Sequence, residues 1–360
     1  MRPKTTNLRV GDWVEIRSKE EILQTLDSKG QLEGMPFMPE MFAFCGKKFQ
    51  VYKRAHKTCD TVFPVRGRRV AQAVHLETRC DGQAHDGCQA GCLIFWKVAW
   101  LKPIRRGSSD EPARNPNSYP QPPSNLPAPR CTESDVLAHT RDDKQGGTDP
   151  YYVCQATELP YATTKLEWWE ISQYVEDYLS GNVGLWSIFC GALYSLFYSL
   201  SVAGIKLGRP IRWVFDTFHP LWGGTPFPQR TGTIPLGQPT PTSTLNLQPG
   251  EMVRVKSHDE ILKTLNTRNR NRGLYFDAEE VPYCGGTYRV LRRVSKIINE
   301  KTHKMQEMKQ PCLILDSAIC QSRFSNCRMF CPRSIYAYWH EAWLERVGPD
   351  PAATGPQENP

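Results

Sequence analysis

The sequence predicts an α+β protein that contains the same small, β-rich, cysteine-rich module twice. Three observations predict this architecture. Residues 10–27 resemble residues 249–266 at a constant offset of 239, which is the separation of Gly11 and Gly250. Each copy places an alternating apolar and polar run directly before a helix start signal. Proline-rich stretches lie between the copies and mark the connections.

Matching cysteines show that the repeat extends far beyond its first residues. Four pairs occupy equivalent positions in the two copies, the second pair after a one-residue shift: Cys45 and Cys284, Cys80 and Cys320, Cys88 and Cys327, Cys92 and Cys331. Both copies also end on related aromatic segments, at 95–101 and 338–344. A register that holds over such a length indicates an internal duplication.

Each copy predicts a strand, a short helix and further short strands. Residues 13–17 and 252–256 alternate between apolar and polar side chains, which is typical of a half-buried strand. Ser18 with Glu21, and Ser257 with Glu260, form capping boxes at which a helix begins. Residues 49–52, 288–291 and 312–315 predict more strands. This order of elements favours an SH3-like barrel with an inserted helix for each copy.

Composition divides the chain into six segments. We expect Cys-rich module 1 at 1–104, a disordered linker at 105–150, a helical segment at 151–215, a proline-rich linker at 216–247, Cys-rich module 2 at 248–348 and a disordered tail at 349–360. Within the helical segment, residues 166–179 predict an amphipathic helix that carries the Trp168-Trp169 pair.

An uncharged stretch follows that helix. Residues 181–205 contain no charged side chain, and Lys206, Arg209 and Arg212 come next. The length reaches the roughly 20 residues that a membrane-spanning helix needs, and cations flank the cytoplasmic end of such helices. Serines and glycines lower its hydrophobicity, however, and a single crossing would separate two modules that carry one ligand pattern. We therefore favour a packed helix over contact with a membrane surface or a full span.

Cysteine usage indicates the compartment. The chain has 13 cysteines, and residues 1–10 are polar without the apolar stretch of a secretory signal. We therefore expect a cytoplasmic protein, with peripheral contact or anchoring to the membrane through residues 182–205 as the alternatives. Clustered thiols in a reducing compartment indicate metal ligation before disulfide formation, and buried free thiols are the alternative.

Two recurring sets of thiols predict metal centres. Thiolate ligands are typical of closed structural zinc sites, and a four-thiolate iron–sulfur cluster needs the same ligands. The predicted metal ligands are Cys45, Cys59, Cys80, Cys88, Cys92, Cys284, Cys312, Cys320, Cys327 and Cys331. Zinc is the expected cofactor, and an iron–sulfur cluster is the alternative.

Further candidates lie near the first set. His56, His75 and His85 occur only in the first copy, although a histidine in a polar loop is more often a plain surface residue. Cys59 with His56 as its base would form a catalytic pair, but no oxyanion or substrate-binding motif accompanies them.

Three cysteines lie outside the two copies. Cys131 and Cys154 could add to the first centre, whereas Cys190 lies in the uncharged stretch and is expected to be a small buried side chain.

Charge and missing motifs restrict the function classes. The formal net charge of +8 is modest for 360 residues, and no phosphate-binding or dinucleotide-binding glycine motif occurs. Basic residues do cluster in each copy, for example at Arg68 and Arg69 and at Arg292 and Arg293. Single-stranded nucleic-acid binding is one interpretation of these clusters, and a solvated basic face is the preferred one.

Three motifs resemble an uncharacterised bacterial family that has no established activity. They are GDWVEIRSKEEIL at 11–23, HKTCD at 56–60 and FCPRSIY at 330–336. The similarity covers nearly the whole chain, including CQATEL at 154–159. The resemblance implies a bacterial protein and nothing about its chemistry.

The expected function is that of a metal-stabilised tandem binding or adaptor protein without catalysis of its own. Its partner, a protein or a membrane surface, would bind through the helices within 166–205. One alternative is an accessory iron–sulfur or metal-dependent protein of a bacterial biosynthetic pathway. The other alternative is single-stranded nucleic-acid binding.

Overall fold

The computed structural model describes residues 8–62, 66–104, 131–142, 149–202, 208–222, 224–325 and 327–348. The chain forms two compact units. Unit 1 comprises Met1–Leu193, Lys296–Gln306 and Gln321–Ile335, and unit 2 comprises Tyr194–Ser295, Glu307–Cys320 and Tyr336–Pro360. Each unit mixes helices with antiparallel strands, so the predicted α+β class is confirmed.

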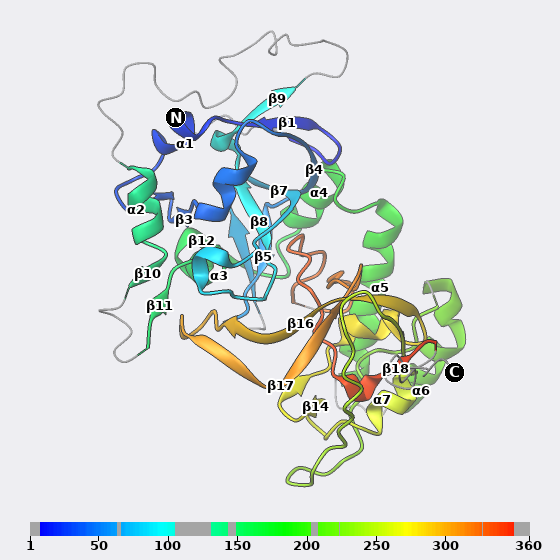
Figure 1. Ribbon diagram of the computed structural model, residues 1–360. Coiled ribbons are helices and arrows are strands. Elements are labelled where there is room, and N and C mark those ends of the chain that lie inside the picture. The colour runs from blue at the N-terminus through cyan, green and yellow to red at the C-terminus, as the bar shows by residue number, and fades with distance from the viewer. Residues whose placement is uncertain are drawn as a thin grey trace, which may run out of the picture. The chain divides into compact units, whose positions relative to one another are not determined.

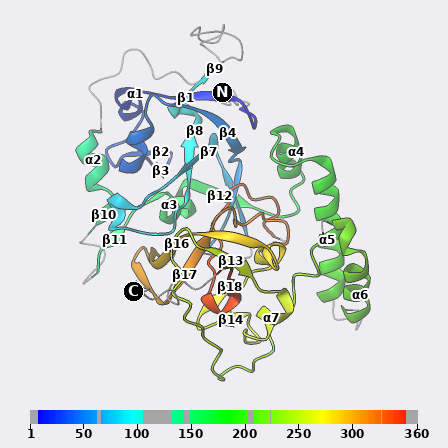
Figure 2. The same cartoon turned by 45° about the vertical axis from the view of Figure 1, so that its right-hand side comes forward.

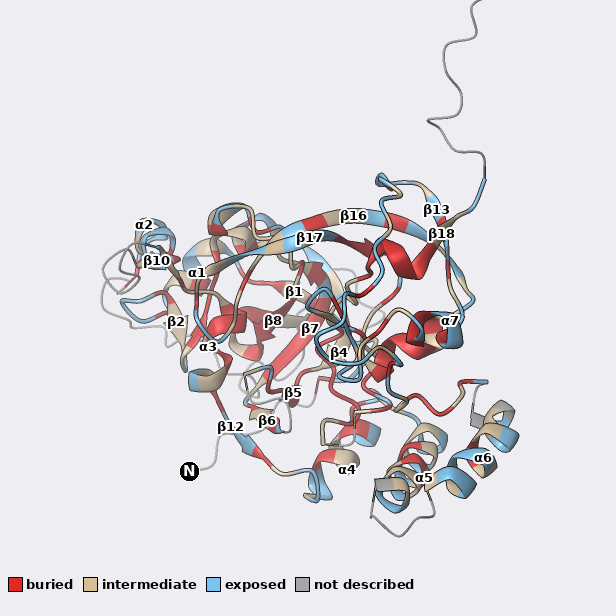
Figure 3. Ribbon diagram, turned by 90° about the horizontal axis from the view of Figure 1, so that it is seen from below, coloured by how far each residue is buried: buried red, intermediate tan, exposed pale blue. Residues whose placement is uncertain are grey.

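Unit 1 is built around a five-stranded antiparallel sheet in the order β8-β7-β4-β1-β9, which can be followed in Figures 1 and 2. Its strands are β1 (Trp13–Ile16), β4 (Lys48–Arg54), β7 (Ala73–Arg79), β8 (Leu93–Lys97) and β9 (Leu101–Ile104). A second sheet, β12-β6-β5, consists of β5 (Lys57–Cys59), β6 (Gly67–Val70) and β12 (Thr163–Leu166). Every residue of β8 is buried, so this strand lies inside the core (Figure 3).

Short elements surround these sheets. The strand pairs are β2 (Gln31–Leu32) with β3 (Met35–Pro36), and β10 (Arg141–Asp142) with β11 (Tyr151–Tyr152). The helices are α1 (Lys19–Leu23), α2 (Glu133–Ala138), α3 (Gln155–Ala162) and α4 (Ser172–Leu179), and the 3-10 turns are η1 (Pro39–Phe44), η2 (Gln83–His85) and η3 (Val98–Trp100). Helix α5 (Leu185–Val202) begins in unit 1 and ends in unit 2.

Unit 2 contains a four-stranded sheet in the order β17-β16-β13-β18. The strands are β13 (Met252–Val255), β16 (Thr287–Ile298), β17 (Met305–Leu315) and β18 (Leu344–Arg346), with the small pair β14 (Arg270–Asn271) and β15 (Leu274–Tyr275). The helices are α6 (Gly208–Phe218) and α7 (His258–Leu262), and the 3-10 turns are η5 (His219–Trp222), η6 (Ala278–Tyr283) and η7 (Glu341–Trp343).

The first strands of the two copies pair in the same register. Val14 lies opposite Phe49 in unit 1, and Val253 lies opposite Tyr288 in unit 2, so both partners keep the offset of 239 residues. The helices that follow begin at the two predicted capping boxes, each with both hydrogen bonds present. Identical local signals thus produce identical local structure.

Each core contains an equivalent tryptophan. Trp100 in unit 1 and Trp343 in unit 2 are fully buried. Trp100 Nε1 donates to Thr25 Oγ1 and Trp343 Nε1 donates to Thr264 Oγ1, both at 3.0 Å. These bonds satisfy the indole N–H groups, which makes the burial of such large side chains favourable.

Part of the predicted linker at 105–150 is ordered. Residues 105–130 and 143–148 lie outside the described chain, but Cys131 and Val136 are buried in the unit 1 core. Thr132 and Asp135 form a capping box that starts α2. The prediction of disorder was wrong here because it weighed composition above this local signal.

The predicted linker at 216–247 packs on unit 2. Phe227 and Leu247 are fully buried, and Ile234 forms a β-bridge with Asn266. The backbone N–H of Gly232 donates to Asn269 Oδ1 at 2.7 Å. Proline restricts the backbone, so this extended segment loses less conformational entropy when it packs.

The boundaries of the second module and those of the helix predicted at 166–179 both differ from the prediction. Lys296–Gln306 and Gln321–Ile335, which lie inside the range 248–348, belong to unit 1. Of the predicted helix at 166–179, only Ser172–Leu179 is helical. Its first residue, Leu166, instead ends strand β12 (Thr163–Leu166), which pairs with β6. The β-branched threonines at 163 and 164 favour the strand. The predicted tail at 349–360 lies outside the described residues.

Among the described residues, no helix combines the length and the apolar composition that crossing a membrane requires.

Candidate metal centre

A loop between β7 and β8 carries three thiols. Cys80 directly follows β7, and Cys88 and Cys92 precede β8. The backbone N–H of Cys80 donates to Cys92 O at 2.9 Å, which closes the loop. Gly82 has a φ of +74°, and a Cβ at this position would collide with the carbonyl of Cys88. The conformation of the loop therefore requires glycine at this position.

Three further elements bring polar side chains to this loop. Cys154 is the N-cap residue of α3, and its N–H donates to Thr157 Oγ1 at 2.9 Å. Glu40 lies in the first turn of η1, and His85 is the last residue of η2. Donor groups from separate parts of the sequence therefore meet inside unit 1.

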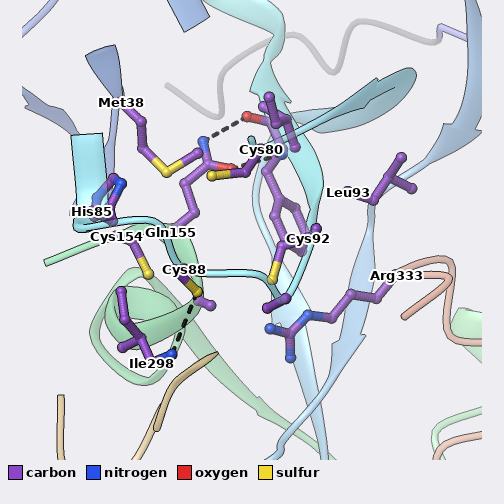
Figure 4. Close-up of a pocket in the computed structure, with 15 residues that line it drawn as sticks. Met38, Cys80, His85, Cys88, Cys92, Leu93, Cys154, Gln155, Ile298 and Arg333 are labelled. Carbon is purple, nitrogen blue, oxygen red and sulfur yellow. Dashed lines mark hydrogen bonds between the residues drawn. The ribbon is translucent and has the colours of Figure 1, made fainter. Parts of the chain in front are cut away.

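A cavity of about 30 Å³ lies between these elements. Its lining includes four cysteines and several other polar or sulfur-containing side chains: Cys80, Cys88, Cys92, Cys154, Met38, His85, Gln155 and Arg333. Figure 4 shows the sulfur atoms of Cys88, Cys92 and Cys154 turned toward the cavity. A space of this size holds one water-sized group or one ion.

Glu40, Cys80 and His85 form a compact donor set, because one ligating atom from each lies within 4.8 Å of the other two. His85 Nδ1 lies 2.8 Å from Glu40 Oε1, and Cys80 Sγ donates to the same oxygen at 3.6 Å. His85 Nε2 lies 3.1 Å from Val153 O, which can only accept. Nε2 therefore carries a proton, and Nδ1 faces the carboxylate as a second N–H or as a metal ligand.

His85 and Glu40 each favour the charged form of the other, although both are buried. Burial opposes the charge on His85, but the hydrogen bond and the charge of Glu40 raise its pKa. Burial likewise opposes ionisation of Glu40, but His85 lowers the pKa of the carboxyl group. Glu40 Oε2 is buried and has no hydrogen-bond partner among the described residues. A cation beside the pair would satisfy this oxygen.

The buried thiols are protonated unless a cation compensates their charge. Burial raises the pKa of Cys92 to about 11 and that of Cys154 to about 12, and it raises the pKa of Cys80 still further. A transition-metal ion reverses this preference, because it binds the thiolate and displaces the proton. The donor set of thiols and an imidazole suits zinc.

The first predicted ligand set is brought together only in part. Cys80, Cys88 and Cys92 line the cavity, but Cys45 is the C-cap residue of η1 and is not among the residues of the lining. Cys59 is buried at the end of β5, where its N–H donates to Cys331 Sγ at 3.0 Å. Cys59 thus neighbours a cysteine that was predicted for the other copy.

The second predicted set is divided between the units. Cys327 and Cys331 belong to unit 1, whereas Cys284, Cys312 and Cys320 belong to unit 2. Within unit 2, the Cys312 thiol is buried and donates to Val294 O at 3.8 Å. The equivalence of the cysteines in sequence therefore does not extend to an equivalent thiol cluster in space.

The structure does not support the alternative of a catalytic Cys59–His56 pair. His56 Nε2 lies 3.3 Å from Asp177 Oδ1 and 3.2 Å from Gln173 O. Lys57 Nζ also contacts Asp177, at 2.6 Å from Oδ2. His56 and Lys57 of the HKTCD motif thus connect the start of β5 to α4 through the buried Asp177.

The sequence predicted Cys154 only as a possible ligand, and it did not predict Glu40. Cys154 was only a possible addition, and its signal was the thiol at a helix N-cap before Thr157. Glu40 was not predicted, because a glutamate in the first turn of a helix-like segment is ordinary. His85 was a candidate, and the structure places it beside Cys80.

Comparisons with known proteins found no match: no protein-family model, curated protein or solved structure matches the chain. The resemblance to a bacterial family therefore stays a prediction.

Proposed function

We propose that unit 1 holds one transition-metal ion, with zinc as the first candidate, and that the chain is a metal-stabilised binding protein. The observation that carries this proposal is the donor set of Glu40, Cys80 and His85, whose ligating atoms lie within 4.8 Å of one another, while Cys88, Cys92 and Cys154 line the cavity of about 30 Å³ beside it. A thiolate from this cavity would complete the four ligands of a closed zinc site. The ion would cross-link the loop before β8 to the start of α3, and so contribute directly to folding.

Glu40 and His85, which lie against Cys80, would supply a carboxylate and an imidazole to the ion. Zinc bound by one carboxylate and two thiolates carries a net negative charge, and Arg333 is a buried cation in the lining of the same cavity that would balance it.

An iron–sulfur centre is the second candidate, because four cysteines are among the residues that line the cavity. The two candidates differ in colour, because iron–sulfur clusters absorb visible light and zinc thiolates do not. A spectrum of anaerobically purified full-length protein separates them. A strong visible band together with stoichiometric iron would replace zinc by iron in the proposal.

Elemental analysis of the full chain, purified without added metal, tests the centre. About one metal ion per chain is expected, rather than one per repeated copy. Cys88→Ala and Cys154→Ala should lose the ion. Cys312→Ala is the control, since it removes a buried thiol from unit 2 and should retain the ion.

Two outcomes would contradict the proposal. One is wild-type protein that contains no metal and takes up no cobalt, judged by the absence of thiolate-to-cobalt absorption. The other is retention of metal by both cavity variants and its loss from Cys312→Ala. The cobalt measurement uses the wild-type chain, so it decides the question even where a variant fails to fold.

We also propose that each copy is an SH3-like barrel that serves as a binding module without catalysis of its own; this fold-level reading rests on the antiparallel sheets of the two units. A role in a bacterial biosynthetic pathway would follow only from an iron–sulfur or reactive centre. Single-stranded nucleic-acid binding is weakened by pairing within the basic cluster: Arg68 contacts Asp60, and Arg69 contacts Glu170 and Glu176.

A further inference from the structure

Helix α5 exposes an apolar face along its whole length. Leu185, Phe189, Leu196 and Leu200 are 62, 55, 55 and 39 % exposed. Their separations of four, seven and four residues place them on one side of an α-helix. Trp186 borders this stripe and is 68 % exposed. The 18-residue helix is about 27 Å long, so the stripe is far larger than an isolated surface leucine.

The opposite side of the helix is buried in each unit. In unit 1, a Cβ at Gly191 would collide with the ring of Phe330. In unit 2, Tyr194 is 3 % exposed and packs edge-on against Phe215 of α6 with ring centroids 6.1 Å apart. Figure 3 shows the contrast, since α5 is mostly tan and pale blue with short red parts. The helix is thus packed on one side, and its apolar stripe stays in water.

Along the chain, the charged residues that follow the stripe are basic. No Asp or Glu occurs between Asp177 and Asp216, whereas Lys206, Arg209 and Arg212 lie in that interval. Helix α6 exposes Arg209 and also Trp213, which is 69 % exposed. Arg212 stacks over the ring of Phe227, 5.4 Å from its centroid. A partner for this surface must therefore offer apolar contact and negative charge together.

We propose that the exposed face of α5, with the basic start of α6, docks on the surface of an anionic phospholipid bilayer. Leucine, phenylalanine and tryptophan on one helix face are typical of helices that lie in the interface. Tryptophan favours the headgroup level, where its ring is buried and its N–H stays hydrated. Exposed arginines gain from the negative surface potential of anionic lipids. Residues 178–215 contain no acidic side chain, so this stretch itself adds no repulsion to the contact.

Sedimentation of the full chain with lipid vesicles tests the proposal. Binding is expected to vesicles in which about one third of the phosphatidylcholine is replaced by phosphatidylserine, with much weaker binding to phosphatidylcholine alone. Phe189→Glu should weaken binding by at least about tenfold, because it removes a large apolar contact and adds a repelled charge. Arg209→Glu should weaken it by roughly fivefold or more at low salt, and the difference should shrink as salt is raised.

Leu137→Glu is the matched control, since Leu137 is 57 % exposed on α2, outside the proposed surface. Its binding should equal that of the wild type. The substituted side chains at 189 and 209 are exposed, so the variants should fold, and circular dichroism checks this. Absence of binding to anionic vesicles overturns the proposal. So does a self-associated wild type that Phe189→Glu converts to a monomer, because a second copy would then cover the face. Metal analysis is independent of either result.

Discussion

Arg333 and Glu300 form a bidentate ion pair within unit 1, in which the arginine is buried and the glutamate partly exposed. Arg333 Nη2 lies 2.7 Å from Glu300 Oε1, and Nη1 lies 3.2 Å from Oε2. The arginine side chain is almost fully buried. The pair joins Gln321–Ile335 to Lys296–Gln306, the two segments that unit 1 takes from the second copy of the repeat.

Arg333→Leu is therefore expected to destabilise unit 1 strongly. It removes the ionic partner of Glu300, and because Glu300 is partly exposed the cost should lie at or below the roughly 3 kcal/mol of breaking a fully buried pair. Chemical denaturation of the full chain measures the change. Arg254→Leu is the control, because Arg254 pairs with Glu345 on the surface and its loss should leave the denaturation midpoint almost unchanged. Equal effects of the two variants would contradict the assignment.

Gly82→Ala is expected to lower both stability and metal content. The left-handed backbone alone costs an alanine about 1 kcal/mol, and the new Cβ also meets the Cys88 carbonyl, so the loop must open. Gly46→Ala separates the two effects, since Gly46 has the same φ of +74° and no atom within 4 Å of the added Cβ. Denaturation and elemental analysis should show metal loss for Gly82→Ala only. Metal loss in both variants, or in neither, would show that the loop conformation does not control the site.

Removal of the metal should lower the unfolding midpoint of the wild type but not that of Cys154→Ala. An ion that binds only the folded state adds about 2.7 kcal/mol when its free concentration is 100-fold above Kd. Scanning calorimetry with and without a chelator should therefore show a lower midpoint for the wild type after chelation. Cys154→Ala should unfold at the lower midpoint in both conditions. A wild-type midpoint that ignores the chelator would argue against a structural ion.

Stability should fall on acidification because of His75. This side chain is fully buried, and burial lowers its pKa from 6.5 to about 3. Its Nδ1 contacts Ile94 O at 2.9 Å, and its Nε2 has no hydrogen-bond partner among the described residues. The folded state keeps the ring neutral while the unfolded state binds a proton below the unfolded pKa. The neutral ring therefore makes its full contribution to the free energy of unfolding above pH 6.5. This contribution is lost as the pH falls toward 3.

The slope of stability against pH measures this effect. His75 should contribute about 1.4 kcal/mol per pH unit at about pH 5. His75→Gln removes the titration, so urea denaturation at about pH 7 and about pH 5 should show a smaller difference for the variant than for the wild type. An unchanged difference would mean that His75 is protonated in the folded state.

Local structure was predictable from the sequence where neighbouring residues determine it. The capping boxes at Ser18 and Ser257 start helices, and the strands at Val14 and Val253 pair in equivalent registers. These features depend on short-range hydrogen bonds and on the alternation of apolar side chains. Both can be recognised from the residue types at neighbouring positions.

Only the tertiary structure decided which thiols meet. By sequence, Cys331 matches Cys92 and was grouped with Cys284, yet it lies against Cys59 in unit 1, while Cys154 joins Cys88 and Cys92 at the cavity. All cysteines look alike in a sequence, and a repeat alignment assumes that each copy folds on its own. Long-range contacts such as those of Cys59 with Cys331 and of Arg79 with Ser334 instead draw part of the second copy into the first unit. The energy of such contacts depends on groups far apart along the chain, so no local pattern reveals them.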